Sequence, residues 1–345
     1  MNKKTLSHCA LGVLAASIGL NAQTIEWNTS ATDGDWNDAA SWDGGAVPTD
    51  ANTTLVKISQ PTNVTVSDSV TASKLTTGAT STLTVNSGGT LTVATQFLIG
   101  ENGSNANGNR YGTVELNAGG EIAVDTSHVQ IGSWNTGAEE SFLNISGGTF
   151  TVSAKELWVG RGAAGTLNLS GGTVDLNNKT DTNSSWQTLR IGDNEGDGTV
   201  NMTGGTLSTY GLRMNNNNTG NSNFNLDGGT LIVNGGFTSA IDIDNPNVEL
   251  AISDGVFKWQ SNRISDLDGM ITGGLITFST STVSTITATA EQSWTAADGT
   301  ILYADYDEVE SGFTTLWATA VVPEPSTYGF LFGSFLFAWA MLRRR

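Results

Sequence analysis

Acidic side chains that alternate along one loop are the residues best suited to bind a cation. Asp193, Glu195 and Asp197 stand at every second position and Gly198 follows them, as in the first half of a calcium loop with oxygen ligands. The glutamate that completes such a loop is missing at the expected spacing, so the alternative is an acidic turn in contact with solvent. The sequence therefore predicts no cofactor apart from a candidate Ca²⁺ site at these three residues.

Three tryptophans offer a second kind of chemistry, the stacking of aromatic rings on sugars. Trp134, Trp158 and Trp186 would form an exposed row if the fold placed them on one side of the molecule. Single aromatic residues on a protein surface are common and require no such role. The three residues are therefore candidates for a carbohydrate-binding surface, with ordinary surface placement as the alternative.

Residues for catalysis are scarce. The 345-residue chain has one Cys and two His, which leaves little for thiol chemistry, a zinc site or a Ser-His-Asp triad. His128 precedes an inward Val129, so we expect a histidine that points to solvent. Glycoside hydrolysis needs two carboxylates facing one groove, whereas Glu115 aligns with Asn144 and Asp175 stands alone. The sequence predicts a protein that is not an enzyme, and a divergent polysaccharide lyase or hydrolase is an alternative.

The charge balance excludes another class of partner. The chain has 33 acidic and 15 basic residues and a formal charge of −18, so no nucleic acid is expected to bind. Between residues 24 and 322 there are 32 acidic and 10 basic residues. Such a segment should be soluble and should repel anionic polymers unless a cation bridges them.

The first 22 residues have the pattern of a secretory signal peptide. Lys3 and Lys4 precede an apolar run over 10–20, and Ala22 closes a plausible cleavage site. The apolar run is about half the length that a membrane span needs. Cys9 lies inside this segment, so the exported chain is expected to have no disulfide bond.

Residues 321–345 form a second targeting segment with three parts in order. Pro323, Glu324 and Pro325 come first, an apolar helix is expected over 328–342, and Arg343, Arg344 and Arg345 close the chain. This end resembles the PEP-CTERM sorting signal of Gram-negative bacteria. The resemblance implies a membrane-embedded exosortase as a partner during export, and a precursor held transiently in the inner membrane by its C-terminal helix. The alternative is a plain tail anchor, for which the apolar run is short.

The region between these ends is a repeat with apolar positions at matching places. Segments such as STLTVNSGGTLTV from Ser81 and SFLNISGGTFTV from Ser141 recur, and short motifs such as FLIG and LWVG follow them. The matching apolar positions are Leu83, Val114, Leu143, Leu167, Val200 and Phe224, which lie 31, 29, 24, 33 and 24 residues apart. The smallest of these spacings is 24 residues, and the larger ones vary, which indicates a coil of fixed length with loops inserted into some of its copies.

Alternation with period two predicts an all-β protein, a parallel β-helix of about 24-residue coils. Apolar side chains would point inward at Val85, Leu91, Val93, Ile99, Leu143, Ile145, Phe150, Val152, Leu157 and Val159. Glycines are expected at corners with positive φ, at Gly148, Gly172, Gly100, Gly132, Gly160 and Gly192. Outward threonines would form a ladder through Thr90, Thr149, Thr173, Thr206 and Thr230. The rival fold is a β-sandwich.

This pattern resembles the autotransporter-associated β-strand repeats of bacterial surface proteins over residues 81–237. The resemblance and the usual chirality of parallel connections imply a right-handed coil. Residues 23–80 are expected to form a Trp-rich N-terminal cap and the first strands. Trp27, Trp36 and Trp42 in this segment either cap the open end of the first coil or form a platform for sugars. Residues 238–320 are expected to form irregular final coils and a C-terminal cap.

Together these features predict an exported β-solenoid at the cell surface or in the extracellular matrix. Its expected role is structural or adhesive, in contact with exopolysaccharide through many weak hydrogen bonds. A carbohydrate-binding module that uses the tryptophans is the first alternative, and the polysaccharide lyase is the second.

Overall fold

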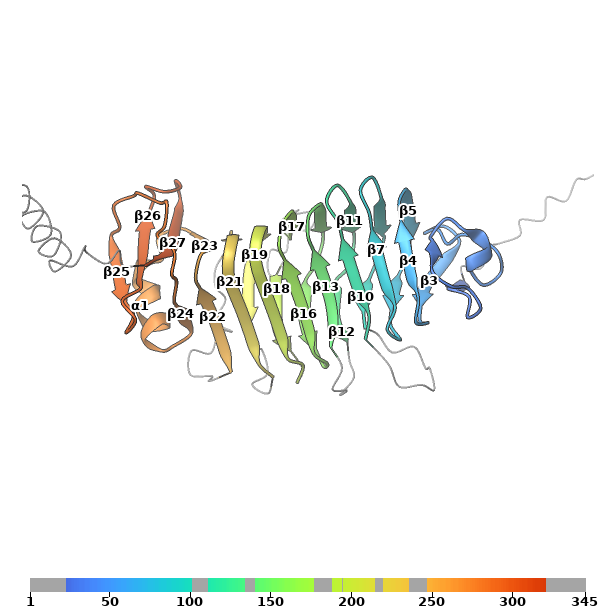
Figure 1. The fold of residues 1–345 in the computed structure, drawn as a ribbon, viewed down its shortest axis with the longest axis horizontal. Coiled ribbons are helices and arrows are strands. Elements are labelled where there is room, and N and C mark those ends of the chain that lie inside the picture. The colour runs from blue at the N-terminus through green and yellow to red at the C-terminus, as the bar shows by residue number, and fades with distance from the viewer. Residues whose placement is uncertain are drawn as a thin grey trace, which may run out of the picture.

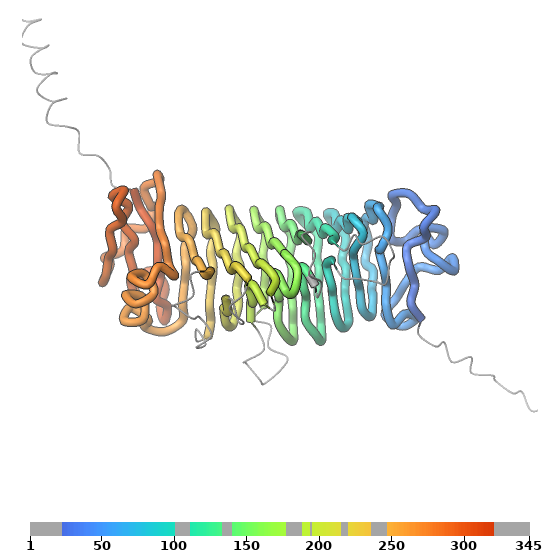
Figure 2. Tube along the Cα trace, turned by 90° about the horizontal axis from the view of Figure 1, so that it is seen from below, coloured from blue at the N-terminus to red at the C-terminus, as the bar shows by residue number. Residues whose placement is uncertain are grey.

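The structure is an elongated stack of coils built mostly from parallel β-strands (Figure 1), and the tube in Figure 2 follows the coils one after another. This computed structural model describes residues 23–100, 111–133, 140–176, 188–193, 195–214, 220–235 and 247–320. The signal segment 1–22, the sorting segment 321–345 and Ile241 and Ile243 of the predicted final coils lie outside the described residues. The parallel stacking is consistent with the predicted β-helix.

Three strands in each regular coil pair with their equivalents in the next coil, so the strands form three faces. Face 1 contains β2 (Gly34–Asp35), β4 (Asn63–Val66), β7 (Thr82–Val85), β10 (Thr113–Leu116), β13 (Ser141–Ile145), β16 (Gly165–Leu169), the first halves of β19 (Gly198–Thr209) and β21 (Ser222–Val233), β22 (Val248–Ile252) and β24 (Ile276–Phe278). Face 2 contains β5 (Ser69–Ala72), β8 (Thr90–Val93), β11 (Glu121–Val124), β14 (Thr149–Val152), β17 (Thr173–Asp175), the second halves of β19 and β21, and β23 (Val256–Gln260). Face 3 is an eight-stranded sheet of β1 (Gln23–Glu26), β3 (Thr53–Ile58), β6 (Leu75–Thr77), β9 (Phe97–Ile99), β12 (Val129–Ser133), β15 (Leu157–Arg161), β18 (Thr188–Asp193) and β20 (Gly211–Met214).

The predicted register of the repeat is confirmed along face 1. Leu83, Val114, Leu143, Leu167, Val200 and Phe224 are direct partners in successive parallel pairs. The same row begins one coil earlier at Val64 and continues to Leu250 and Ile276, so the regular coils extend beyond the predicted 81–237 at both ends. Because these pairs are parallel, they do not fit the antiparallel β-sandwich that was the rival fold.

Successive side chains of a strand point to opposite faces, so every second one points into the stack. All ten predicted inward residues, from Val85 to Val159, are buried and belong to one continuous hydrophobic cluster. Burying a side chain of this size contributes about 1.5–3 kcal/mol. The core is therefore shared between coils, and no coil buries its apolar face alone.

The corner glycines adopt the backbone conformation that was predicted for them. Gly160, at the corner after the inward Val159, has φ of +74°, and Gly148 at the other corner has +71°. A side chain at Gly160 would also meet the next coil, since a Cβ there would lie 2.1 Å from the carbonyl oxygen of Asp197. Both the left-handed backbone and the close approach of two coils require glycine at this corner.

The N-terminal end is closed by a cluster of three buried tryptophans. Trp27 and Trp36 each contact Trp42 edge-on, with ring centroids 4.8 and 4.9 Å apart. The indole Nε1 of Trp42 donates to the carbonyl oxygen of Trp36 at 2.7 Å, and a short 3-10 helix (Ala39–Ser41) connects these residues. All three rings are buried in the core. This burial fits the capping hypothesis, and it excludes an exposed platform for sugars.

The C-terminal end is closed by a different element. β27 (Phe313–Thr319) pairs antiparallel with β23, and β26 (Ile301–Tyr306) and β25 (Gln292–Thr295) extend the cap beyond it. β26 and β27 are the last strands of the described part of the chain. The helix α1 (Ile264–Thr272) was not predicted, and it buries Leu267 and Met270 against the end of the stack.

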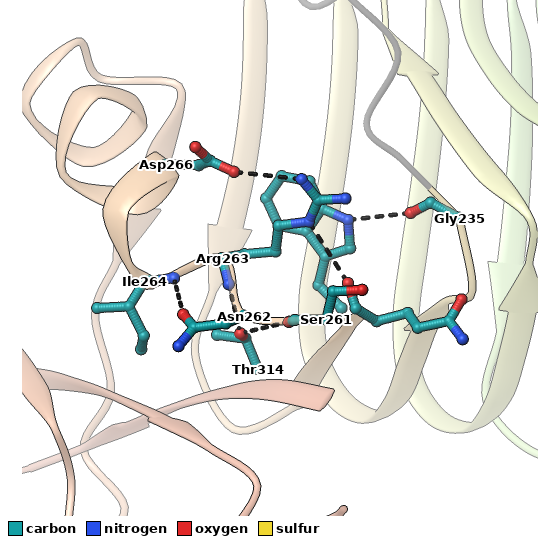
Figure 3. Close-up of polar contacts among 9 residues, drawn as sticks. Gly235, Ser261, Asn262, Arg263, Ile264, Asp266 and Thr314 are labelled. Carbon is teal, nitrogen blue, oxygen red and sulfur yellow. Dashed lines mark hydrogen bonds and ion pairs between the residues drawn. The ribbon is translucent and has the colours of Figure 1, made fainter. Parts of the chain in front are cut away.

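Figure 3 shows the turn that connects the last coil to this cap. Arg263 lies over the ring of Trp259 at 4.9 Å, and its backbone N–H donates to the hydroxyl of Thr314 at 2.8 Å. That hydroxyl in turn donates to the carbonyl of Ser261, which has a positive φ of 73°. The strained residue is thus held by hydrogen bonds from the cap.

Candidate functional site

Face 3 carries a row of side chains that the sequence places beside the glycine corner. The register confirms the order Leu98, Gln130, Trp158, Arg190 and Arg213 in successive coils. The first three are only 2%, 1% and 7% exposed, although they point away from the core. The outer side of this part of face 3 is therefore buried, and the expectation of an exposed ring is wrong for Trp158.

Trp158 lies at the centre of this row and has no open ring face. The guanidinium of Arg161 lies 3.7 Å from the centroid of its ring, and the ring of His128 meets it edge-on at 4.4 Å. A cation over the face of an indole is attracted by the ring quadrupole. A sugar would have to displace Arg161 in order to stack there. Trp134 and Trp186, the other two candidates, lie outside the described residues.

Two buried carboxylates join the same cluster. Arg190 reaches Glu156 at 2.5 Å and Asp193 at 3.9 Å, and the side chains of these three residues are 14%, 2% and 7% exposed. Burial raises the pKa of Glu156, and the charge and hydrogen bond of Arg190 oppose that rise. Removing a partner from a buried ion pair leaves an uncompensated charge and is strongly destabilising.

His128 is half-buried here, which corrects the expectation that it points freely to solvent. Its ring nitrogens contact the side chains of Gln96 and Ser127. Burial, and after it the nearby cations Arg161, Lys155 and Lys74 in that order of importance, lower the pKa of His128 to about 4. The imidazole is therefore neutral at pH 7, as packing against Trp158 and Arg161 requires.

The candidate calcium loop does not bring its three acids together. The carboxylate of Asp193 turns toward Arg190, and the Oδ1 of Asp197 accepts the backbone N–H of Asn221 at 2.7 Å and its Nδ2 at 3.0 Å. Glu195 is exposed at the tip of the turn. Among the residues that the structure describes, no three His, Cys, Asp or Glu side chains are grouped to hold a metal. The calcium site remains a prediction.

Faces 1 and 2 carry regular ladders of polar side chains. On face 1 each asparagine amide donates to the preceding coil: Asn144 to Glu115 at 2.7 Å, then Asn168 to Asn144, Asn201 to Asn168 and Asn225 to Asn201, each at 2.8 Å. On face 2 the predicted threonine ladder is in register, with Glu121 between Thr90 and Thr149. The rows through Glu115, Glu121 and Asp175 place no second carboxylate beside any of these acids, so they supply no carboxylate pair.

A cavity of about 170 Å³ lies apart from these rows, between the last coil and the cap. Val256, Trp317 and Ile286 line it, with Asp254 at its rim. The carboxylate of Asp254 accepts hydrogen bonds from the hydroxyls of Thr280 and Thr282, so it fastens the segment that passes over the cavity.

Sequence reasoning treated Trp158 and His128 as separate surface residues and missed the cluster in which His128 contacts Trp158 and Glu156 pairs with Arg190. A signal was present, since Lys74, Gln96, His128 and Glu156 each stand directly before an apolar strand of face 3. Comparisons of this chain with family models, with curated proteins and with solved structures find no match.

Proposed function

We propose that this chain is an exported structural or adhesive protein without enzymatic activity, which contacts exopolysaccharide at the cell surface or in the extracellular matrix. The observation that carries the proposal is the asparagine ladder of face 1 together with the threonine ladder of face 2. They present a repeated set of amide and hydroxyl groups at intervals of about 4.8 Å.

Such a surface suits a polymer with repeated hydroxyl groups. Each hydrogen bond to solvent-exposed sugar contributes little, because water competes for both partners. Many of them on one rigid scaffold act together, since the first contact raises the effective concentration of the next. The carboxylates of Glu156 and Asp193 support the non-catalytic assignment, because both face Arg190 in ion pairs.

The route to the surface is part of the proposal. The signal segment 1–22 and the PEP-CTERM-like segment 321–345 would direct export, exosortase recognition and transient anchoring by a C-terminal hydrophobic helix. In the part of the chain that the structure describes, no helix has the length and apolar character to cross a membrane. We also propose that the coil is right-handed, as parallel crossover connections usually are.

The proposal is tested by co-sedimentation of the full chain with insoluble matrix polysaccharide from the producing cells. Deleting residues 82–112 removes one coil and keeps the register, because Thr82 and Thr113 are partners; deleting 222–247 does the same for Ser222 and Val248. An adhesive ladder predicts that each deletion weakens retention and that both together weaken it more. A single local site predicts that only one deletion matters, and absence of any retention of the full chain refutes the proposal.

Delivery is tested separately by the intact mass of the protein recovered from the native envelope and medium. A species that ends near Pro325 without the arginine tail supports sorting. A full-length chain fixed in the inner membrane contradicts it and indicates a tail anchor.

A further inference from the structure

The cavity between the last coil and the cap lies one coil beyond the last threonine of the face 2 ladder. Thr230 is the direct partner of Val256, and Val256 is in turn the direct partner of Trp317 on β27. Both Val256 and Trp317 line the cavity. A polymer that follows the threonine row along the stack therefore reaches the wall of this cavity at the next coil.

The cavity has room for one six-membered ring. Its volume is about 170 Å³ and it is partly open to solvent. An engineered cavity of about 150 Å³ in another protein accepts benzene. Val283, which lines the cavity, is 53% exposed and is the only exposed large hydrophobic residue in the described part of the chain. A bound ring would remove the apolar surface of this side chain from water.

The lining combines apolar side chains with hydroxyl and carboxylate groups. Trp317 is only 3% exposed and stacks on Tyr303 with ring centroids 5.7 Å apart, so it forms a closed floor. The accessible part of the lining is made by Val256, Val283 and Ile286 together with Ser284, Thr285 and Asp254. A sugar ring has the same division, with C–H groups on its faces and hydroxyls along its edge. Apolar walls with a few polar groups that fix orientation are typical of sites for small ligands.

Asp254 is placed to accept hydrogen bonds from such a ring. Its side chain is exposed, and its two carboxylate oxygens accept one hydroxyl each, from Thr280 and from Thr282. A carboxylate has about four acceptor sites, so each oxygen keeps one for a ligand. The two threonines hold the carboxylate in one orientation, in which two neighbouring sugar hydroxyls can donate to it. A negative charge at this place disfavours an anionic sugar.

We infer that this cavity binds one pyranose residue of a neutral polysaccharide, with a C–H face of the ring against Val256, Val283 and Ile286 and two neighbouring hydroxyls on Asp254. The inference rests on the proposed function, and it specifies the class of polymer and the place of attachment. The coil repeat of about 4.8 Å is close to the length of one pyranose residue, so the threonine row can contact the sugars that follow.

The test uses the full chain and two probes prepared from the matrix of the producing cells. These are the neutral and the acidic oligosaccharides that partial hydrolysis releases and anion exchange separates, and their binding is measured by calorimetry. Asp254→Asn removes the carboxylate at the cavity. Asp227→Asn is the matched control, because Asp227 lies at the corresponding corner of the preceding coil and also accepts a hydroxyl, from Ser253. Val283→Ser removes apolar surface from an exposed position.

We expect the neutral fraction to bind and the acidic fraction not to bind. Asp254→Asn should weaken binding about tenfold, which corresponds to the loss of one hydrogen bond to a charged group. Val283→Ser should weaken it about fivefold through the lost apolar contact. Asp227→Asn should bind like the parent. The melting temperatures of all variants are compared, and if Asp254→Asn unfolds, Val283→Ser decides, because its exposed side chain carries little of the core.

Several results would overturn the inference. Binding of the acidic fraction in place of the neutral one would assign recognition to charge. Equal losses in Asp254→Asn and Asp227→Asn would show that net charge matters and the cavity does not. Unchanged binding in both cavity variants would place the sugar elsewhere. Any of these results, with the full chain still retained on native matrix, leaves the proposed function standing, whereas absence of that retention refutes the proposed function itself.

Discussion

Gly160 and Gly88 provide a matched pair for testing how closely the coils approach at the corners. Both have positive φ, +74° and +84°. They differ in what surrounds them: a Cβ on Gly160 would lie 2.1 Å from the carbonyl oxygen of Asp197, whereas the nearest atom to a Cβ on Gly88 is the carbonyl oxygen of Ser67 at 3.9 Å. Alanine at each position separates the cost of the backbone conformation from the cost of the clash.

The expected magnitudes follow from these two terms. A left-handed conformation costs an L-residue about 1–2 kcal/mol, so Gly88→Ala should lower the free energy of unfolding by about that amount. Gly160→Ala carries the same cost and must also move Asp197, whose carbonyl accepts the backbone N–H of Gly165 at 3.0 Å. Backbone on both coils has to shift, so we expect a total loss above about 4 kcal/mol, in the range reserved for disrupted cores.

The assay is guanidinium unfolding of the full chain and both variants, followed by tryptophan fluorescence and circular dichroism. The difference between the two variants is the quantity of interest, because their backbone cost is shared. Equal losses would refute the clash at Gly160 and with it the close contact of coils at this corner. A loss of more than about 4 kcal/mol in Gly88→Ala would refute the assignment of open space there.

Three further changes test the polar rows. His128→Gln should abolish a pH dependence of stability that comes from the imidazole. The pKa of His128 is about 4 in the native chain and ordinarily 6.5, so the unfolded chain binds the proton first as the pH falls. The free energy of unfolding of the parent should therefore fall by about 1–2 kcal/mol as the pH drops from 6.5 toward 4, after discounting for solvent screening. Titration of the imidazole by NMR checks the native value, and a midpoint near 6.5 contradicts the burial argument. Asn201→Leu breaks two ladder hydrogen bonds and should cost about 1–3 kcal/mol in chemical denaturation; an unchanged midpoint would show that the ladder contributes nothing. Arg190→Met leaves Glu156 and Asp193 without their shared cation. We expect a loss of about 3–5 kcal/mol at pH 7 that lessens as the pH falls and Glu156, whose pKa is raised by burial, becomes protonated. A loss that is the same at low pH would refute the role of charge.

The regular part of the fold could be predicted because one residue type recurs at one structural position. The apolar row from Leu83 to Phe224 fixes which strands pair, and glycines such as Gly160 fix the corners. The coil before the repeat was predicted only as first strands, outside the repeat, because Ser67 and Asp68 stand where later coils have a glycine pair. The pairing of β4 with β7 and of β5 with β8 defines that coil, since it has no glycine pair at its corner.

The helix α1 and the cluster on face 3 were missed for different physical reasons. The α1 segment is nine residues long with Gly269 near its end, and its helical state depends on burying Leu267 and Met270 against the last coil. No local pattern of that length specifies a helix, because tertiary packing decides it. On face 3 the alternation of residues gives the direction of Trp158, but only the folded chain shows that Arg161 and His128 cover it.

The stacking of coils also determines how the protein responds to a pulling force. The first and last described residues lie at opposite ends of the stack, and consecutive coils are joined to each other by ladders of backbone hydrogen bonds (Figure 1). Tension between the two ends therefore loads the coils in series, and they detach one at a time from an end. A coil adds about 4.8 Å to the folded length, but the 24 residues between Leu143 and Leu167 span about 80 Å when extended. Each coil that yields would lengthen its own part of the molecule many times over while the remaining coils stay folded, so the chain would act as an extensible link between whatever its two ends hold.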